Sequence, residues 1–112
     1  MSITFQPLNQ AVCVNLSGRL DSNNAAAVEQ ALLARIEAGD SRLVIDLADL
    51  DYISSAGLRV FLVVAKKLRQ QQGRLSLCNM SKTIRQVFEI SGFVSILSVC
   101  EDRDAAYATI MQ

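Results

Sequence analysis

Apolar residues along the chain recur with two periods, one typical of strands and one typical of helices. Residues 3–5 and 11–16 are rich in β-branched and apolar side chains and flank a turn at residues 8–10, which predicts an opening hairpin. Residues 43–45 form a continuous apolar run, as expected of a central strand that is covered on both faces. Residues 74–78 alternate polar and apolar positions, which is typical of a half-buried strand.

Two amphipathic helices are predicted between these strands. The Asp, Ser and Asn residues at 21–24 form a helix start signal before apolar residues at 28, 32 and 36, and Gly39 is placed to end this helix. A longer helix begins at Ser55 and ends at Gly73, with basic residues in its last turns that complement the helix dipole. Its apolar stripe consists of Leu58, Val60, Phe61, Leu62, Val63, Val64, Ala65 and Leu68.

The C-terminal part of the chain predicts two more helices and one more strand. Ser81 can cap a helix that ends at Gly92. The core positions expected on this helix are Ile84, Val87, Phe88 and Ile90. Residues 94–99 predict a final strand, and residues 101–111 predict a terminal helix opened by Asp102 or Asp104.

The order of these elements predicts an α/β fold in a single domain that spans residues 1–112. Helices of crossover length between the later strands imply parallel neighbours, and the opening hairpin adds an antiparallel edge. We therefore expect a mixed sheet of about five strands with about four helices packed on it.

Composition and charge exclude several classes of function. Eleven basic and eleven acidic residues cancel, and aromatic residues make up only 5%, so no nucleic-acid partner is expected. No apolar run reaches the roughly 18 residues of a spanning helix, so no membrane insertion is expected. The N-terminus lacks the regions of a signal peptide, which favours a cytoplasmic location. Neutral charge without an obvious apolar patch favours a monomer when the protein is free.

The inventory of reactive side chains argues against an enzyme. The chain has no His and no CxxC motif, which excludes Ser-His or Cys-His catalysis and leaves no basis for a zinc site. Both standard Gly-rich nucleotide loops are absent, so we expect no cofactor. Cys13, Cys78 and Cys100 are set in apolar surroundings and are predicted to be buried, reduced thiols.

Three acidic residues, Asp46, Asp49 and Asp51, lie at or just after the end of the predicted central strand. One interpretation is a metal pocket of the receiver-domain type. Such a pocket needs acids from more than one strand end, together with a Lys that this chain does not place. Solvated carboxylates on a short acidic loop are therefore the favoured interpretation.

Ser54 and Ser55 fall where the longer helix must begin, and two functions compete for them. A serine hydroxyl can cap the unpaired N–H groups of a helix start, a contribution of about 1 kcal/mol. Alternatively, a serine at this position can be phosphorylated, because a helix N-terminus tolerates the added negative charge. On the residues alone, capping is favoured.

Residues 46–59, which read DLADLDYISSAGLR, resemble the signature of STAS domains, in particular the single-domain anti-sigma factor antagonists. Residues 17–21, SGRLD, are similar to a second family motif, and the length and order of elements also agree. The resemblance implies that Ser55 is phosphorylated, with Ser54 as a second possible acceptor where the family usually has Asp. Ser55 would cap the helix in one state and carry phosphate in the other. The partner-binding residues expected from the resemblance are Asp21, Ser22, Asn23, Ser54, Ser55, Ala56, Gly57 and Arg59.

The resemblance also implies a partner-switching circuit. In this circuit the unphosphorylated antagonist binds an anti-sigma factor that is itself a GHKL-type serine kinase. Phosphorylation by that kinase releases the antagonist, and a PP2C-type phosphatase restores it. The alternative is a STAS subunit of a membrane transport system that acts as a constitutive interaction module. The free-standing chain and the serine at the switch position favour the circuit.

Overall fold

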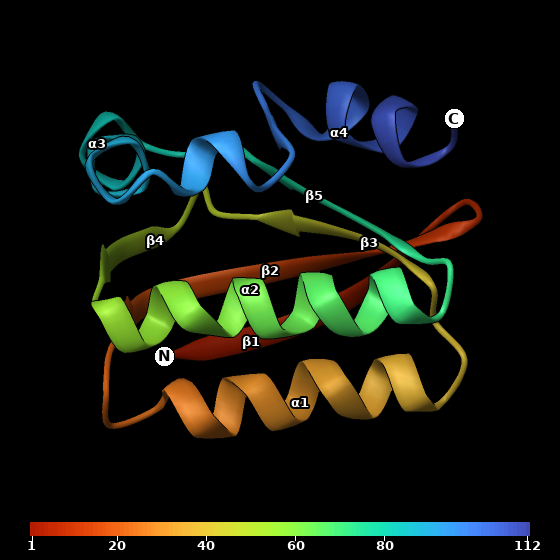
Figure 1. The fold of residues 1–112 in the computed structure, drawn as a ribbon, viewed down its shortest axis with the longest axis horizontal. Helices are drawn as coiled ribbons and strands as arrows, with labels where there is room; N and C mark the ends of the chain where they lie inside the picture. The colour runs from red at the N-terminus through yellow and green to blue at the C-terminus, as the bar shows by residue number, and fades with distance from the viewer.

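A computed structural model describes residues 1–112, and its strands form one mixed sheet. The strands are β1 (Ser2–Leu8), β2 (Ala11–Leu20), β3 (Arg42–Asp46), β4 (Leu50–Ile53), β5 (Arg74–Cys78) and β6 (Val99–Cys100). Their order is β1-β2-β3-β5-β6, with β4 pairing the far half of β2 (Figure 1). Only the β1–β2 pair is antiparallel. The predicted fold class, a mixed sheet with an opening hairpin, is confirmed.

Four α-helices and one short 3₁₀ helix cover the sheet. They are α1 (Ala25–Glu37), α2 (Ser55–Gln70), α3 (Lys82–Ser91), η1 (Phe93–Ser95) and α4 (Arg103–Ile110). In Figure 1, α1 and α2 lie side by side on one face, α4 covers the other face, and α3 lies beside β4. Alternate strand residues point to opposite faces, so the core has two parts. The larger part lies under α1, α2 and α3, and the smaller part under α4.

The second strand continues beyond its predicted end. Gly18 adopts a φ of 95°, and the register shifts between Gly18 and Arg19. The strand therefore bends instead of ending, and it exchanges β3 for β4 as its partner. The residues predicted as an acidic loop consequently include a short strand, β4, whose end residues Leu50 and Ile53 are both buried.

Two predictions about the C-terminal part are wrong. The strand expected at residues 94–99 is mostly η1 and a turn, because Ser95 donates its hydroxyl to the Gly92 carbonyl and local hydrogen bonds replace a ladder. Ile90, expected in the core, is 87% exposed. It lies about 200° around α3 from the buried Phe88, since each helical residue turns the chain by about 100°. The caps at Ser81 and Asp102 are confirmed.

Asp46 is not a solvated carboxylate, and this prediction is also wrong. Only 3% of Asp46 is exposed, at the end of β3 beneath the start of α4. Its carboxylate forms an ion pair with Arg103 and accepts hydrogen bonds from the Ala48 N–H (2.9 Å) and the Asn79 amide (3.2 Å). Burial raises the pKa of Asp46, but these hydrogen bonds outweigh burial and hold the pKa below its ordinary value. The Asp46–Arg103 ion pair thus holds the start of α4 against the end of β3.

Replacing Arg103 with Ala should destabilise the protein by leaving the Asp46 carboxylate buried without its partner. We expect a loss of about 2–3 kcal/mol, below the roughly 3–5 kcal/mol of a fully buried pair, because the Arg103 side chain is 37% exposed. The lowered pKa of Asp46 gives stability that is present above the unfolded value of 3.8 and is lost as pH falls through the folded pKa. Urea unfolding at several pH values should show that the difference in unfolding free energy between the wild type and Arg103→Ala becomes smaller in acid.

Arg35→Ala is the matched control, because the Asp40 carboxylate that it leaves unpaired is 31% exposed, whereas the Asp46 side chain is 4% exposed. It should cost about 1 kcal/mol or less. If Arg103→Ala and Arg35→Ala lost the same unfolding free energy, the buried Asp46–Arg103 pair would not stabilise the fold as proposed.

The cysteines are all free, and two of them belong to the smaller core. Cys13 and Cys78 are buried beneath α4, and Cys100 is half-buried. Burial raises the pKa of Cys13, and it raises that of Cys78 to about 12. Both buried thiols therefore stay protonated at neutral pH, where a thiol is a poor nucleophile.

Candidate functional site

Ser54 is the residue that caps α2. Its backbone is extended, with φ −94° and ψ 175°, and its Oγ accepts a hydrogen bond from the Gly57 N–H at 3.2 Å. Its own N–H donates to the Leu20 carbonyl at 2.9 Å, which fixes the start of α2 to the end of β2. Ser54 is half-buried. Its hydroxyl therefore has a structural task, the one that serines commonly perform at this position.

Ser55 is the first residue of α2 and has no such task. The residue is exposed, and its hydroxyl makes no hydrogen bond with another residue. The prediction that Ser55 caps the helix is therefore wrong, because the extended backbone of an N-cap falls one residue earlier. Instead, the two serines divide the roles, so that one holds the helix start and the other presents a free hydroxyl beside it.

Gly57 explains how α2 approaches the sheet so closely. A Cβ atom at this position would lie 2.8 Å from Cγ of Leu20 and 3.0 Å from Cγ1 of Ile53. Contacts that short displace the neighbouring groups, so only glycine fits there without a shift of the helix. The next residue, Leu58, is 5% exposed and packs in the larger core. This packing sets the height of Ser55 above the sheet.

The turn at residues 21–24 stands next to the serines because Leu20 is bonded to Ser54. The Asp21 carboxylate accepts a hydrogen bond from the Asn23 N–H at 2.9 Å, and the Asn24 side chain accepts one from the Asp21 N–H at 3.0 Å. The same Asn24 amide donates to the Arg19 carbonyl at 2.8 Å. Ser22 and Asn23 are exposed at the tip of this hydrogen-bonded turn.

A groove between α1 and α2 joins several predicted site residues. Its lining consists of Ser22, Ala25, Ala26, Glu29, Ala56, Arg59, Val60 and Val63, around a volume of about 390 Å³. Ser22, Ala56 and Arg59 were predicted as partner-binding residues, and the groove brings these three together. A second hollow of about 330 Å³, lined by Leu33, Glu37, Val63, Lys66, Lys67 and Gln70, continues along the same two helices.

Sequence reasoning missed Glu29 and Val63 as part of this surface. Val63 was expected to widen the buried stripe of α2, but it is 40% exposed and lines both hollows. Glu29 lies on α1, far from the serine motif in the sequence, and no local pattern connects the two. Only the packing of α1 against α2 shows that they share one groove.

The charges near the serines differ from the expected acidic loop. Asp46 is removed from this surface by its ion pair with Arg103, while Asp49 and Asp51 remain exposed on either side of Leu50. Arg19 adds a basic group on the neighbouring strand, with its guanidinium carbon 4.1 Å from the centre of the Tyr52 ring. No group of three or more His, Cys, Asp or Glu side chains is placed to hold a metal ion.

Known proteins identify the family. The STAS domain model matches residues 2–106. The chain belongs to the STAS domain family. BtrV of Bordetella bronchiseptica, named as a candidate anti-sigma factor antagonist, is 49% identical over 108 residues, which are 96% of this chain and 93% of BtrV. The anti-sigma-B factor antagonist of Bacillus subtilis is 34% identical over 86 residues, 77% of this chain and 78% of that protein. This STAS domain is therefore a member of the anti-sigma factor antagonist family.

Solved STAS structures have the same fold. A candidate anti-sigma factor antagonist from Thermotoga maritima superimposes with a TM-score of 0.91 at 15% identity, over 98% of this chain and 95% of that one. The Bacillus protein SpoIIAA in its phosphorylated form superimposes with a TM-score of 0.72 at 22% identity, over 96% and 99% of the two chains. Anti-sigma factor antagonists of this family are regulatory binding proteins and not enzymes. In this member, none of the helices has the length and apolarity needed to cross a bilayer.

Proposed function

We propose that this STAS domain is the switchable antagonist of a partner-switching circuit, controlled by phosphorylation of Ser55. The unphosphorylated form binds an anti-sigma factor that is also a GHKL-type serine kinase. That kinase transfers the γ-phosphoryl group of ATP to the Ser55 oxygen, the hydroxyl proton is lost, and ADP remains. A PP2C-type phosphatase hydrolyses the phosphoester with water. The observation that carries this proposal is the free, exposed hydroxyl of Ser55 at the start of α2.

The division of roles between the serines supports this choice of acceptor. Because Ser54 supplies the cap, phosphate on Ser55 removes no hydrogen bond from the folded protein. The positive end of the α2 dipole stabilises added negative charge in the first turn. Phosphorylation therefore changes the charge of the surface while the fold stays intact. Two SpoIIAA structures, one unphosphorylated and one phosphorylated, superimpose on this chain with the same TM-score of 0.72, which is consistent with a fold that accepts both states.

The partner surface that we propose includes the exposed helix start and the groove beside it. It consists of Asp21, Ser22, Asn23, Ser54, Ser55, Ala56 and Arg59, extended by Glu29 and Val63 of the groove. Gly57, which the resemblance also implied, is buried against Leu20 and Ile53 and therefore supports this surface from below. The groove itself has a mostly apolar lining with one acid, Glu29, and one base, Arg59, which resembles the core-and-rim pattern of protein interfaces. A phosphate at Ser55 would stand at the edge of this surface, where it repels or displaces a bound partner.

Mass spectrometry of serine variants tests the proposed acceptor directly. The wild type, Ser55→Ala and Ser54→Ala would each be incubated with ATP and a GHKL-type serine kinase from the same genome. The wild type and Ser54→Ala should each gain one phosphate within residues 52–59, and Ser55→Ala should gain none. Ser54→Ala loses the cap and with it about 1 kcal/mol of stability, so its folding would be checked by circular dichroism.

The same variants also show which serine carries the phosphate if the acceptor is not Ser55. Phosphate on Ser54 in the wild type, or undiminished phosphorylation of Ser55→Ala, would refute Ser55 as the acceptor. No phosphorylation of any variant, despite binding of the kinase, would support a constitutive interaction module instead of a switch.

A further inference from the structure

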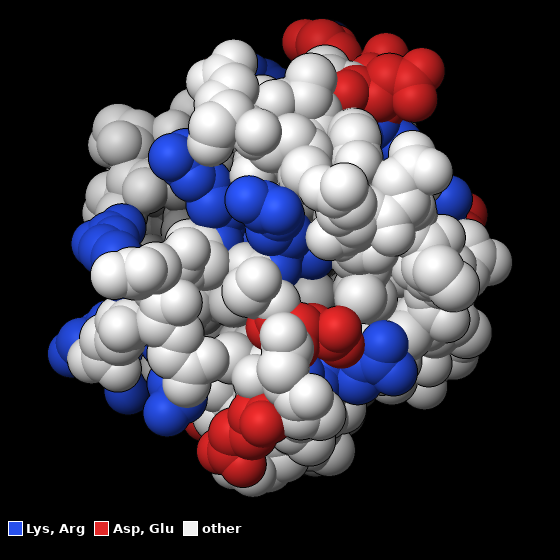
Figure 2. Space-filling view, turned by 90° about the vertical axis from the view of Figure 1, so that its right-hand side faces the viewer, with Lys and Arg blue, Asp and Glu red and all other residues white.

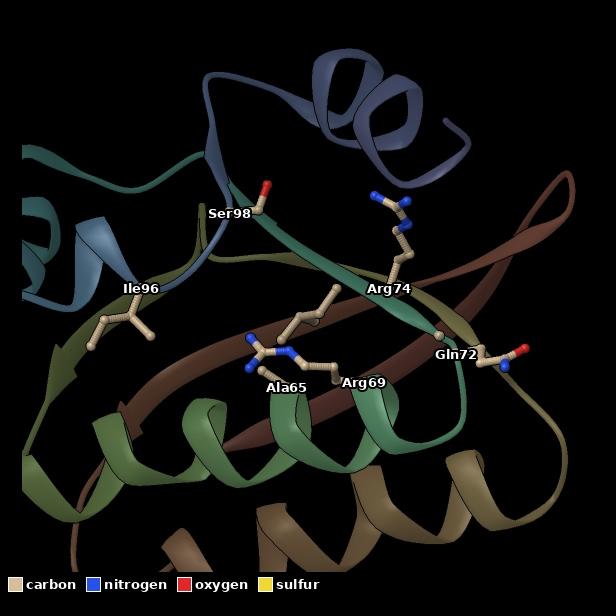
Figure 3. Close-up of a pocket in the computed structure, with 8 residues that line it drawn as sticks. Ala65, Arg69, Gln72, Arg74, Ile96 and Ser98 are labelled. Carbon is tan, nitrogen blue, oxygen red and sulfur yellow. The ribbon is translucent and has the colours of Figure 1, made fainter.

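A hollow lies at the opposite end of α2 from Ser55, where β5 begins. Its volume is about 510 Å³, and its lining residues are Ala65, Arg69, Gln72, Gly73, Arg74, Leu75, Ile96 and Ser98. Figure 3 shows the hollow between the last turns of α2, the start of β5 and the segment that leads into β6. Arg69 and Ser55 are 14 residues apart on one helix, which corresponds to about 21 Å. The hollow is thus separate from the proposed switch.

The hollow exists because β6 is too short to cover the edge of β5. Only Leu77 and Cys78 of β5 pair with β6, so Arg74 and Leu75 have no neighbouring strand on that side. Ser76 is fully buried, and its hydroxyl bonds to Ser98 and Cys100. Leu77 donates its N–H to the Ser98 carbonyl at 2.9 Å, while Arg74 donates in the other direction, to Ser41 of the segment before β3. Since the backbone groups of successive residues alternate in direction, Leu75 points its N–H and C=O to the open side.

No backbone or side-chain group of the protein bonds to Leu75 on this open side. Ser98 bonds to Leu77, and none of residues 96–98 makes a hydrogen bond with Leu75. A strand edge with a free donor and a free acceptor is a template for another extended chain. Such an edge can bind a peptide by β-strand addition, in which main-chain hydrogen bonds supply affinity and adjacent pockets supply specificity.

Two arginines flank this edge on opposite faces of the sheet. In Figure 3 the Arg69 side chain extends from α2 below the edge, and the Arg74 side chain points up toward α4. Neither arginine forms an ion pair, since the two ion pairs of the protein are Arg35–Asp40 and Arg103–Asp46. No acidic residue lines the hollow. Figure 2, which views this end of the molecule, shows basic side chains gathered over its left half.

The geometry points to this edge as a docking site for an acidic, extended segment of a partner protein. The segment adds a short strand beside Arg74 and Leu75 and exchanges two hydrogen bonds with Leu75. Consecutive strand residues point to opposite faces, so two adjacent acidic residues place one carboxylate toward Arg69 and one toward Arg74. An apolar residue next to the acidic pair packs against Ile96, which is 57% exposed. The site is a second interface, used independently of Ser55.

The test uses the intact protein and the blocked peptide Thr-Val-Glu-Asp-Val-Thr as a probe. Titration followed by NMR should shift the amide signals of residues 72–76, and saturating peptide should slow hydrogen exchange at the Leu75 amide at least tenfold. The double variant Arg69→Gln and Arg74→Gln should bind the peptide at least tenfold more weakly. The control double variant Lys82→Gln and Arg85→Gln removes the same charge from α3 and should bind as the wild type does.

Three results would overturn the inference. One is unchanged exchange at Leu75 in the presence of the peptide, which would show that no strand is added. Another is equal binding of a peptide with Lys in place of both acidic residues, which would exclude charge recognition. The third is displacement of the peptide by equimolar inorganic phosphate, which would make the hollow a simple anion site.

Discussion

Leu58→Asp is expected to abolish the folded state at 37 °C. Leu58 is 5% exposed and contributes to the larger core directly below the proposed switch. Removal of a buried leucine side chain typically costs about 2–5 kcal/mol, and an unpaired buried carboxylate adds several kcal/mol more. Their sum approaches or exceeds the whole stability of a domain, about 5–15 kcal/mol. Circular dichroism during heating should show no cooperative transition above 37 °C.

Val63→Asp is the matched control for this substitution. It introduces the same side chain into the same helix, at a position that is 40% exposed. The carboxylate there reaches water, so the expected loss is about 1 kcal/mol or less, as for most surface substitutions. If Leu58→Asp melted at the wild-type temperature, or if both variants lost equal stability, the assignment of the buried face of α2 would be wrong.

The fold was predictable where local patterns and long-range packing agree. Local sequence patterns predicted several elements correctly. These are the opening hairpin, the strands at residues 43–45 and 74–78, and the helix caps at Ser81 and Asp102. Alternation, apolar periodicity and capping residues each act within a few positions of the chain. These elements also follow one another with crossovers of ordinary length, which restricts the topology strongly.

The errors arise where long-range contacts overrule a local pattern. Residues 94–99 are rich in β-branched side chains, but after the turn that follows Gly92 only Val99 and Cys100 pair with β5 as a strand. Asp46 has the sequence context of a loop carboxylate, and only the distant Arg103 makes its burial favourable. A pairing across 57 residues has no local signal in a single sequence.

The candidate site was predictable in its location but not in its detail. The helix start at the serine pair was anticipated from the residues, and its grouping with Asp21, Ser22 and Asn23 only from the family resemblance. The structure places these segments together through the Leu20–Ser54 hydrogen bond. The assignment of the cap was wrong by one residue, since helix boundaries are uncertain by a residue or two without coordinates. The groove was not anticipated, because its walls come from two helices whose relative position depends on packing.

Ser55→Glu is expected to weaken binding to the anti-sigma factor about tenfold without unfolding the domain. This prediction depends on the proposed switch. Like charges placed across a buried interface cost several kcal/mol. Ser55 is exposed at the edge of the proposed surface, so we expect a smaller cost of about 1.4 kcal/mol, which corresponds to a tenfold change in affinity. A phosphoserine carries about −1.5 to −2 charges, so the phosphorylated protein should bind about a hundredfold more weakly. Calorimetry with the kinase and a non-hydrolysable ATP analogue would measure both values.

Two further variants test whether the loss of affinity in Ser55→Glu comes from the charge itself, from the size of the side chain or from a charge at any position. Ser55→Gln has nearly the shape of Ser55→Glu but no charge, and its affinity should stay close to that of the wild type. Ser41→Glu places the same charge on an exposed serine near the other end of α2 and should also bind normally. The melting temperature of Ser55→Glu should equal or slightly exceed that of the wild type, because an acid in the first turn of a helix is stabilising. Equal affinities for Ser55→Gln and Ser55→Glu would show that the partner senses bulk at the helix start, and the electrostatic account of the switch would fail.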